Sequence, residues 1–112
     1  MLKMIIRLNE EKILNEKIYR LDGMYKAIHS AFKQMGFPRI YDTNNAIIYC
    51  DKGDSKDFAK FGRIINTLKK KDWFLDNALE WLLCDSDDAD NPNDFSEEDL
   101  LLYYRQKRSE VA

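Results

Sequence analysis

The sequence predicts an α+β domain of ferredoxin-like topology (βαββαβ), in which a four-stranded antiparallel sheet carries two helices on one face. Two observations predict it. Apolar residues alternate with other residues at 2–8 and form nearly continuous runs at 46–50 and 78–84, which is typical of strands. They recur at helical spacing at 21–35 and 58–68, which indicates two amphipathic helices.

The composition is that of one folded domain, with 112 residues of which 45% are hydrophobic and 34% are charged. No apolar run approaches the roughly 18 residues that are needed to span a bilayer. We therefore expect a cytoplasmic protein without a membrane partner. Two cysteines and one histidine cannot complete a usual zinc site, so no metal or other cofactor is expected and both cysteines are predicted to be buried thiols.

The chain begins with a predicted strand, because every second residue from Leu2 to Leu8 is apolar. Residues 9–18 are mostly polar and predict a long connection with room for a helical turn. The helix that follows is expected to end where Gly36 supplies a left-handed residue and Pro38 cannot continue a helix. Its predicted apolar stripe consists of Leu21, Met24, Tyr25, Ile28, Phe32 and Met35.

A hairpin and a second helix come next. Residues 39–41 and 46–50 are predicted strands, joined by a turn at 42–45 whose residues tolerate a positive φ. Ser55 is the predicted cap of the second helix, and Trp73 follows at its exit, where a large side chain closes the end of the core. The apolar stripe of this helix is predicted to hold Phe58, Phe61, Ile64 or Ile65, and Leu68.

The C-terminal part has a different composition. Residues 1–85 form the predicted ferredoxin-like domain, and residues 86–112 form an acidic linker and a C-terminal helix. Ser96 and Asp99 have the spacing of a capping box ahead of the apolar residues 100–104, which predicts a helix of about three turns. We expect this helix to dock on the open face of the sheet or on another subunit.

The formal net charge of −2 hides a separation of charges along the chain. The region after the hairpin is basic, and clustered Lys and Arg side chains displace counterions from phosphate without contacts to bases. We therefore regard it as a candidate nucleic-acid footprint, and the alternative is a solvated helix face. The candidate residues are Lys56, Lys60, Arg63 and Lys70.

The segment from Asp85 to Asp99 holds eight acidic residues and no basic one. Its acids do not have the spacing of an EF-hand loop, so no calcium site is predicted. A solvated linker is one interpretation. The other is that acids next to an apolar helix mimic nucleic-acid phosphate and engage a basic protein partner.

His29 is the only histidine and the natural candidate for a general base near neutral pH. It lies beside the apolar stripe of the first helix, with no Ser or Cys nucleophile nearby in the sequence. The alternative is a boundary histidine that makes a structural hydrogen bond. The sequence has no phosphate-binding glycine loop, HExxH motif or nucleophile elbow.

Several short motifs resemble the virulence-associated protein D (VapD) family. They are residues 21–28, the Met-Gly-Phe-Pro-Arg segment at 35–39, Tyr49 and the stretch 68–73 that closes on a tryptophan. The resemblance implies a ferredoxin-like fold, a homodimer and kinship with the small CRISPR-associated subunit of similar fold. Some members of the family are ribonucleases that act as toxins.

Two positions depart from the family pattern. The family carries an aspartate near the end of the first strand, where this chain has Arg7, and an arginine can neither accept a proton nor hold a divalent cation. Glu10 and Glu11 lie just beyond this strand and would have to fold back to substitute. The Gln-Gly-Ser segment of the family is replaced by the turn at 42–45.

From these features we expect a homodimer that binds RNA, with endoribonuclease activity in a toxin or nucleic-acid defence system as a further expectation. In such a cleavage His29 or Tyr49 would serve as the base and Arg7 or Arg39 as the cationic stabiliser. The alternative is an inactive dimeric adaptor or inhibitor that binds a basic protein through residues 85–99. A small domain whose charges serve only solubility is the third interpretation.

Overall fold

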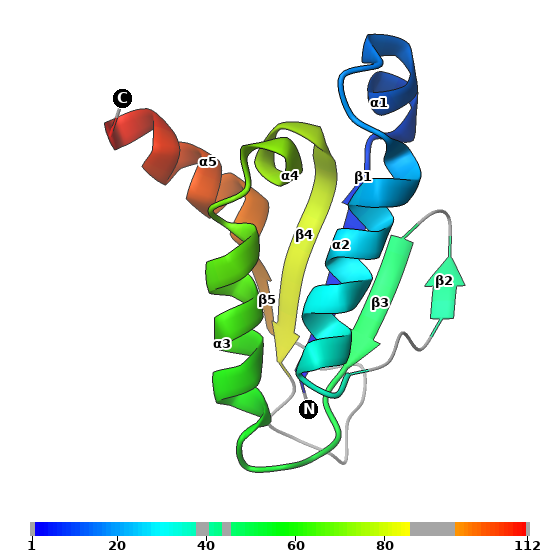
Figure 1. The fold of residues 1–112 in the computed structure, drawn as a ribbon. Coiled ribbons are helices and arrows are strands. Elements are labelled where there is room, and N and C mark those ends of the chain that lie inside the picture. The colour runs from blue at the N-terminus through cyan, green and yellow to red at the C-terminus, as the bar shows by residue number, and fades with distance from the viewer. Residues whose placement is uncertain (1, 38–40, 44–45, 86–95, 112) are drawn as a thin grey trace.

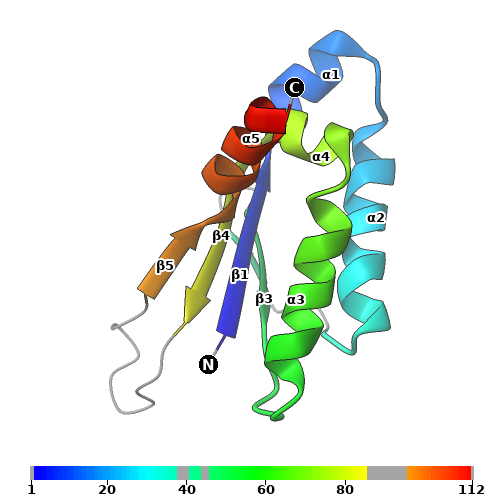
Figure 2. The ribbon, with the colours of Figure 1, turned by 90° about the vertical axis from the view of Figure 1, so that its left-hand side faces the viewer.

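The computed structural model describes residues 2–37, 41–43, 46–85 and 96–111. In this part of the chain one sheet is covered on one face by two long helices, as Figures 1 and 2 show from two sides. The elements in chain order are β1 (Leu2–Leu8), α1 (Glu10–Glu16), α2 (Leu21–Gln34), β2 (Tyr41–Thr43), β3 (Ala46–Cys50), α3 (Asp57–Leu68), α4 (Asp72–Asn77), β4 (Ala78–Asp85), β5 (Ser96–Asp99) and α5 (Leu100–Val111).

The sheet has the strand order β2-β3-β1-β4-β5, and each strand is antiparallel to the strands beside it. The first four of these strands, with α2 and α3, form the ferredoxin-like arrangement, so the predicted fold class is confirmed. Strand β1 lies at the centre, where Ile5 is paired with Ile48 of β3 on one side and with Leu82 of β4 on the other. Strand β5 extends the sheet beyond the predicted four strands.

Alternation along β1 places its two sets of side chains on opposite faces, as predicted. One set is fully buried under α2 and α3, and the intervening side chains are half-buried on the other face. The buried set is Leu2, Met4, Ile6 and Leu8, and the half-buried set is Lys3, Ile5 and Arg7.

Aromatic side chains fill the core between the sheet and the helices. The ring of Phe32 in α2 stacks on that of Tyr49 in β3, with centroids 3.6 Å apart. Trp81 of β4 meets Phe74 of α4 edge to face, with centroids 5.0 Å apart. These large apolar surfaces supply most of the burial that holds the helices on the sheet.

The connection after β1 contains a complete helix, α1, rather than a single turn. The side chain of Asn9 caps it by accepting a hydrogen bond of 3.2 Å from the backbone nitrogen of Lys12. Lys17 ends it with a left-handed backbone (φ 56°). Helix α2 ends as predicted, since Gly36 adopts a φ of 84°.

The start of α3 differs from the prediction. The capping position is Lys56 and no side chain caps the helix there, so the prediction of Ser55 as the cap is wrong. The carboxylate of buried Asp57 instead accepts hydrogen bonds from the backbone nitrogens of Lys52 (2.8 Å) and Asp54 (3.0 Å) in the preceding loop. Because Asp57 is buried, the buried side of α3 continues every three or four residues along the helix, at positions 61, 64 and 68. Phe58 lies on another side of the helix, and 71% of its surface is exposed. The predicted place of Phe58 in the apolar stripe is therefore wrong.

The C-terminal helix also begins later than predicted. Ser96–Asp99 is strand β5, in which Asp99 is paired with Leu82, and not a first helical turn. Asp99 takes the capping role instead, because its carboxylate accepts a hydrogen bond of 3.0 Å from the backbone nitrogen of Leu102.

Helix α5 packs on the main core. Leu100 and Leu101 are buried in the same cluster as the helix-facing residues of β1, so the expected docking on the open face is wrong. A contact of this helix with another subunit stays a prediction. The predicted strand residues 39–40, the turn residues 44–45 and the acidic loop 86–95 lie outside the described residues. None of the helices in the described ranges has the length and apolar composition that crossing a membrane requires.

Candidate nucleic-acid interface

The four predicted nucleic-acid residues follow one side of α3. Lys60 and Arg63 lie three residues apart within the helix, and Lys56 lies one turn before Lys60, so these three share one side, while the residues at 61, 64 and 68 turn into the core. No ion pair joins any of the four to a carboxylate within the described ranges. We call this set, Lys56, Lys60, Arg63 and Lys70, the basic stripe.

The last member of the basic stripe lies just beyond the helix. Helix α3 ends at Leu68, and Lys70 belongs to the turn that leads into α4. This turn carries three consecutive lysines at 69–71, and it adjoins the C-terminal helix. The positive surface of α3 therefore continues towards α5.

A groove of about 540 Å³ lies between this turn, α4 and α5. Its floor is apolar, since Leu75 is buried and the ring of Tyr104 packs against Trp81 with centroids 5.6 Å apart. The groove lies among elements that are far apart in the sequence. We call it the α5 groove, and its lining residues are Lys69, Lys70, Asp72, Leu75, Tyr104, Lys107 and Arg108.

Lysines supply the unbalanced charge of the α5 groove. The guanidinium of Arg108 lies 2.7 Å from Asp76 and 3.5 Å from Asp72, so its charge is matched by two carboxylates. The ammonium group of Lys69 lies over the ring of Tyr104, 5.6 Å from its centroid. In the part of the chain that the structure describes, Lys69, Lys70 and Lys107 have no carboxylate partner.

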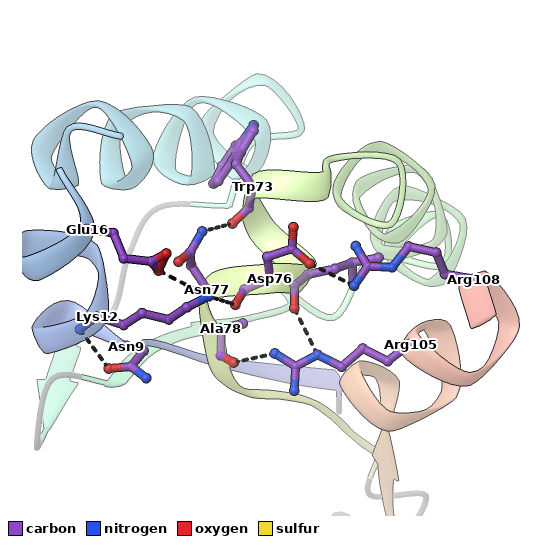
Figure 3. A network of polar contacts seen from close by, with 10 residues as sticks. Asn9, Lys12, Glu16, Trp73, Asp76, Asn77, Ala78, Arg105 and Arg108 are labelled. Atoms are coloured by element: carbon purple, nitrogen blue, oxygen red, sulfur yellow. Dashed lines mark hydrogen bonds and ion pairs between the residues drawn. The ribbon is translucent and has the colours of Figure 1, made fainter. Parts of the chain in front are cut away.

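Arg105 holds α5 against α4, as Figure 3 shows. Its Nε donates to the carbonyl oxygen of Leu75 (2.8 Å) and its Nη2 to that of Ala78 (3.0 Å). From the α1 side, Nζ of Lys12 donates to the carbonyl oxygen of Asp76 (2.7 Å). Cations thus satisfy the carbonyls at the C-terminal end of α4, and one wall of the α5 groove is fixed in place.

The sequence prediction missed the α5 residues of this site. Leu101, Arg105 and Arg108 recur at helical spacing, which is a signal that they share one side of α5. It could not identify their partners, because α4 was expected to be only a short aromatic exit from the preceding helix.

Of the candidate catalytic residues, the structure brings His29 and Tyr49 together. Nδ1 of His29 is hydrogen-bonded to the hydroxyl of Tyr49, and the ring of Tyr25 stacks on His29 with centroids 6.4 Å apart. Only 1% of the surface of Tyr49 is exposed. This arrangement agrees with the alternative prediction of a boundary histidine with a structural hydrogen bond.

Arg7 lies on the opposite face of the sheet. Tyr49 is paired with Met4, and residues three apart on a strand point to opposite faces. The Arg7 guanidinium faces Glu80 instead, with Nη2 3.8 Å from Oε2. A shared role in cleavage would require Arg7 and Tyr49 on one face of the sheet, so the expected combination of these two residues is wrong. Arg39 lies outside the described residues.

The acidic and sulfur-containing residues form no metal site in the described ranges, where no group of three His, Cys, Asp or Glu side chains is suitably placed. Residues 96–99 are exposed along β5. Cys84 is a buried free thiol and Cys50 a half-buried one. Burial raises the pKa of both thiols, and the nearby ammonium group of Lys3 opposes this shift.

The fold and these side chains define an α+β protein of ferredoxin-like topology with a basic outer surface on α3. Comparisons of the chain with family models, with curated proteins and with solved structures found no match. The resemblance to the VapD family therefore stays a prediction, and the functional argument depends on the geometry described above.

Proposed function

We propose that this chain is an RNA-binding protein of the VapD-like class, which contacts phosphates through the basic stripe and the adjoining lysines of the α5 groove. The single observation that carries the proposal is a row of basic residues without carboxylate partners in the described part of the chain, with Lys60 and Arg63 on α3 and with Lys56 and Lys70 at its two ends. Along α3 the helical rise gives a path of roughly 18 Å, long enough to follow several phosphates.

Binding of this kind is local and salt-dependent. The chain as a whole has a formal charge of −2, so a general attraction to polyanions does not supply the affinity. Contacts to four phosphates of a single strand give a slope of about −3 in log K against log salt, or roughly a 50-fold weakening between 50 and 200 mM salt.

The proposal is for binding, and it does not depend on cleavage. Tyr49 is buried, and Arg7 lies on the far face of the sheet from it, so these candidates do not converge on one substrate position. Endoribonuclease activity, a toxin or defence role, a homodimeric state and a cytoplasmic location stay predictions. Incubation of labelled RNA with the purified protein tests the endoribonuclease activity. A native mass measurement tests the homodimeric state.

A titration of a fluorescent 20-nucleotide single-stranded RNA, followed by anisotropy, tests the proposal. The double variant Lys60→Glu/Arg63→Glu should weaken binding at least tenfold and flatten the salt dependence, because two phosphate contacts become repulsive. The matched control is Lys26→Glu/Lys33→Glu on the exposed side of α2, which carries the same change in net charge. Equal losses in both variants would contradict binding at the basic stripe.

A second candidate function, an adaptor for a basic protein, is favoured by the edge strand β5. Glu97, Glu98 and Asp99 are all exposed there, which gives the edge of the sheet a continuous negative charge. A lysine-rich peptide is a suitable probe. The variant Glu97→Gln/Glu98→Gln, which spares the capping residue Asp99, should abolish salt-sensitive peptide binding if the adaptor function is correct, and should leave it unchanged if it is not.

A further inference from the structure

We infer that the α5 groove binds one unstacked nucleotide of a single strand, with the base on the ring of Tyr104 and a phosphate among Lys69, Lys70 and Lys107. This inference rests on the proposed RNA binding and specifies its substrate class as single-stranded rather than duplex RNA. It adds a base-contacting site to the phosphate contacts of the basic stripe.

The size and the lining of the α5 groove suit a nucleotide. Its volume of about 540 Å³ lies within the range of roughly 300–1,000 Å³ that small-molecule sites occupy. Leu75 and Tyr104 give it an apolar floor, and three lysines are among its lining residues. A nucleotide has the same division, with a flat apolar base next to a charged phosphate.

Tyr104 is a preorganised stacking platform. The fully buried Trp81 packs against it from the core, at an interplanar angle of 31°, and Arg105 beside it fastens α5 to α4. The ammonium group of Lys69 now lies over the ring, and it is carried by a flexible side chain. A base can take its place over the ring while the ammonium group moves to a phosphate.

The charge of the α5 groove favours a phosphate-bearing ligand. Asp72 is engaged by Arg108, whereas three lysines have no carboxylate partner within the described ranges. Burial raises the pKa of the Tyr104 hydroxyl above its usual value, and the neighbouring Tyr103 and Glu98 act in the same direction. This hydroxyl is therefore a neutral hydrogen-bond donor at physiological pH.

A duplex cannot use the same site. Its bases are already stacked on their neighbours, so a base reaches an aromatic side chain in a groove only after unpairing, whereas single strands present their bases for stacking. Duplex RNA would retain only the phosphate contacts. The structure therefore favours single strands.

The test compares the binding of a 12-nucleotide single-stranded RNA and of its duplex, by anisotropy, to the full chain and to variants at position 104. The unaltered protein should prefer the single strand at least fivefold. Tyr104→Leu should remove this preference and leave duplex binding within twofold, whereas Tyr104→Phe, which keeps the ring, should retain the preference. Tyr19→Leu is the matched control, because Tyr19 is an exposed tyrosine that does not line the groove, and it should behave like the unaltered protein.

The outcomes separate the inference from the proposed function. Binding of both RNAs with equal affinity, unaffected by Tyr104→Leu in a variant with an unchanged circular dichroism spectrum, would overturn the base site and leave RNA binding intact. Loss of the preference in Tyr19→Leu as well would also overturn it. Failure of the unaltered protein to bind either RNA would overturn the proposed function itself, and tight binding of an acidic peptide in the same assay would assign the groove to a protein.

Discussion

The guanidinium of Arg108 in α5 lies 2.7 Å from the carboxylate of Asp76 in α4, where it forms the outer part of the contact that fixes the α5 groove. Both side chains are partly exposed, so this ion pair alone contributes about 0–1 kcal/mol to the free energy of unfolding. The inner part is Arg105, whose two hydrogen bonds reach the carbonyls of Leu75 and Ala78. The position of the proposed RNA-binding groove therefore depends mainly on Arg105.

Replacement of Arg105 by methionine should lower the free energy of unfolding by about 2 kcal/mol, because two partly buried carbonyls lose charged donors while the apolar stem of the side chain is kept. Chemical denaturation measures this loss. Lys107→Met removes the same charge from the same helix at an exposed position, and it should cost no more than about 0.5 kcal/mol. Similar values for the two variants would show that Arg105 does not hold α5.

Asp57 should be the most sensitive position of the loop that leads into α3. Asp57→Ala leaves the backbone nitrogens of Lys52 and Asp54 without their acceptor, and we expect a loss of about 3 kcal/mol in the free energy of unfolding. Ser55→Ala is the control, since Ser55 is exposed and does not cap the helix. A larger loss for Ser55→Ala than for Asp57→Ala would restore the sequence prediction of the cap.

The buried thiol of Cys84 should make stability fall at alkaline pH. Its pKa is raised in the folded state mainly by burial, so its contribution is complete below the unfolded pKa of about 9 and is lost as the pH rises through the folded value. The difference in unfolding free energy between the unaltered protein and Cys84→Ala should therefore be larger at pH 7 than at pH 10. The non-titrating control Leu79→Ala, at an exposed position, should show the same difference at both pH values.

The predictions that succeeded depend on periodicity within one element. Alternation along Leu2–Leu8 requires one buried face, and the four-and-three spacing of Lys56, Lys60 and Arg63 requires one helical side whatever the rest of the chain does. Patterns of this kind were sufficient for the sheet and its two covering helices. The role of the basic stripe in binding nucleic acid stays a prediction.

The predictions that failed depend on contacts between distant residues. Ser96 and Asp99 match a capping box, but residues 96–99 form a strand instead. This strand makes hydrogen bonds to backbone groups of β4 that would otherwise be unpaired on that edge of the sheet. Phe58 was predicted in the core because its side chain is apolar. The loop amides of Lys52 and Asp54 bind Asp57 and so fix the rotation of α3 about its axis, which leaves Phe58 exposed. The α5 groove brings Lys69 beside Tyr104, and no local pattern contains both residues.

Mapping of the RNA-contacting residues by nuclear magnetic resonance tests the central claim most directly. Single-stranded RNA added to the labelled protein should shift backbone amide signals along the outer side of α3, through residues 69–71 and around Tyr104, and these shifts should shrink as salt is raised. Shifts confined to β5 and the open face of the sheet, or no shifts at RNA concentrations that saturate the anisotropy signal, would contradict RNA binding through the basic stripe.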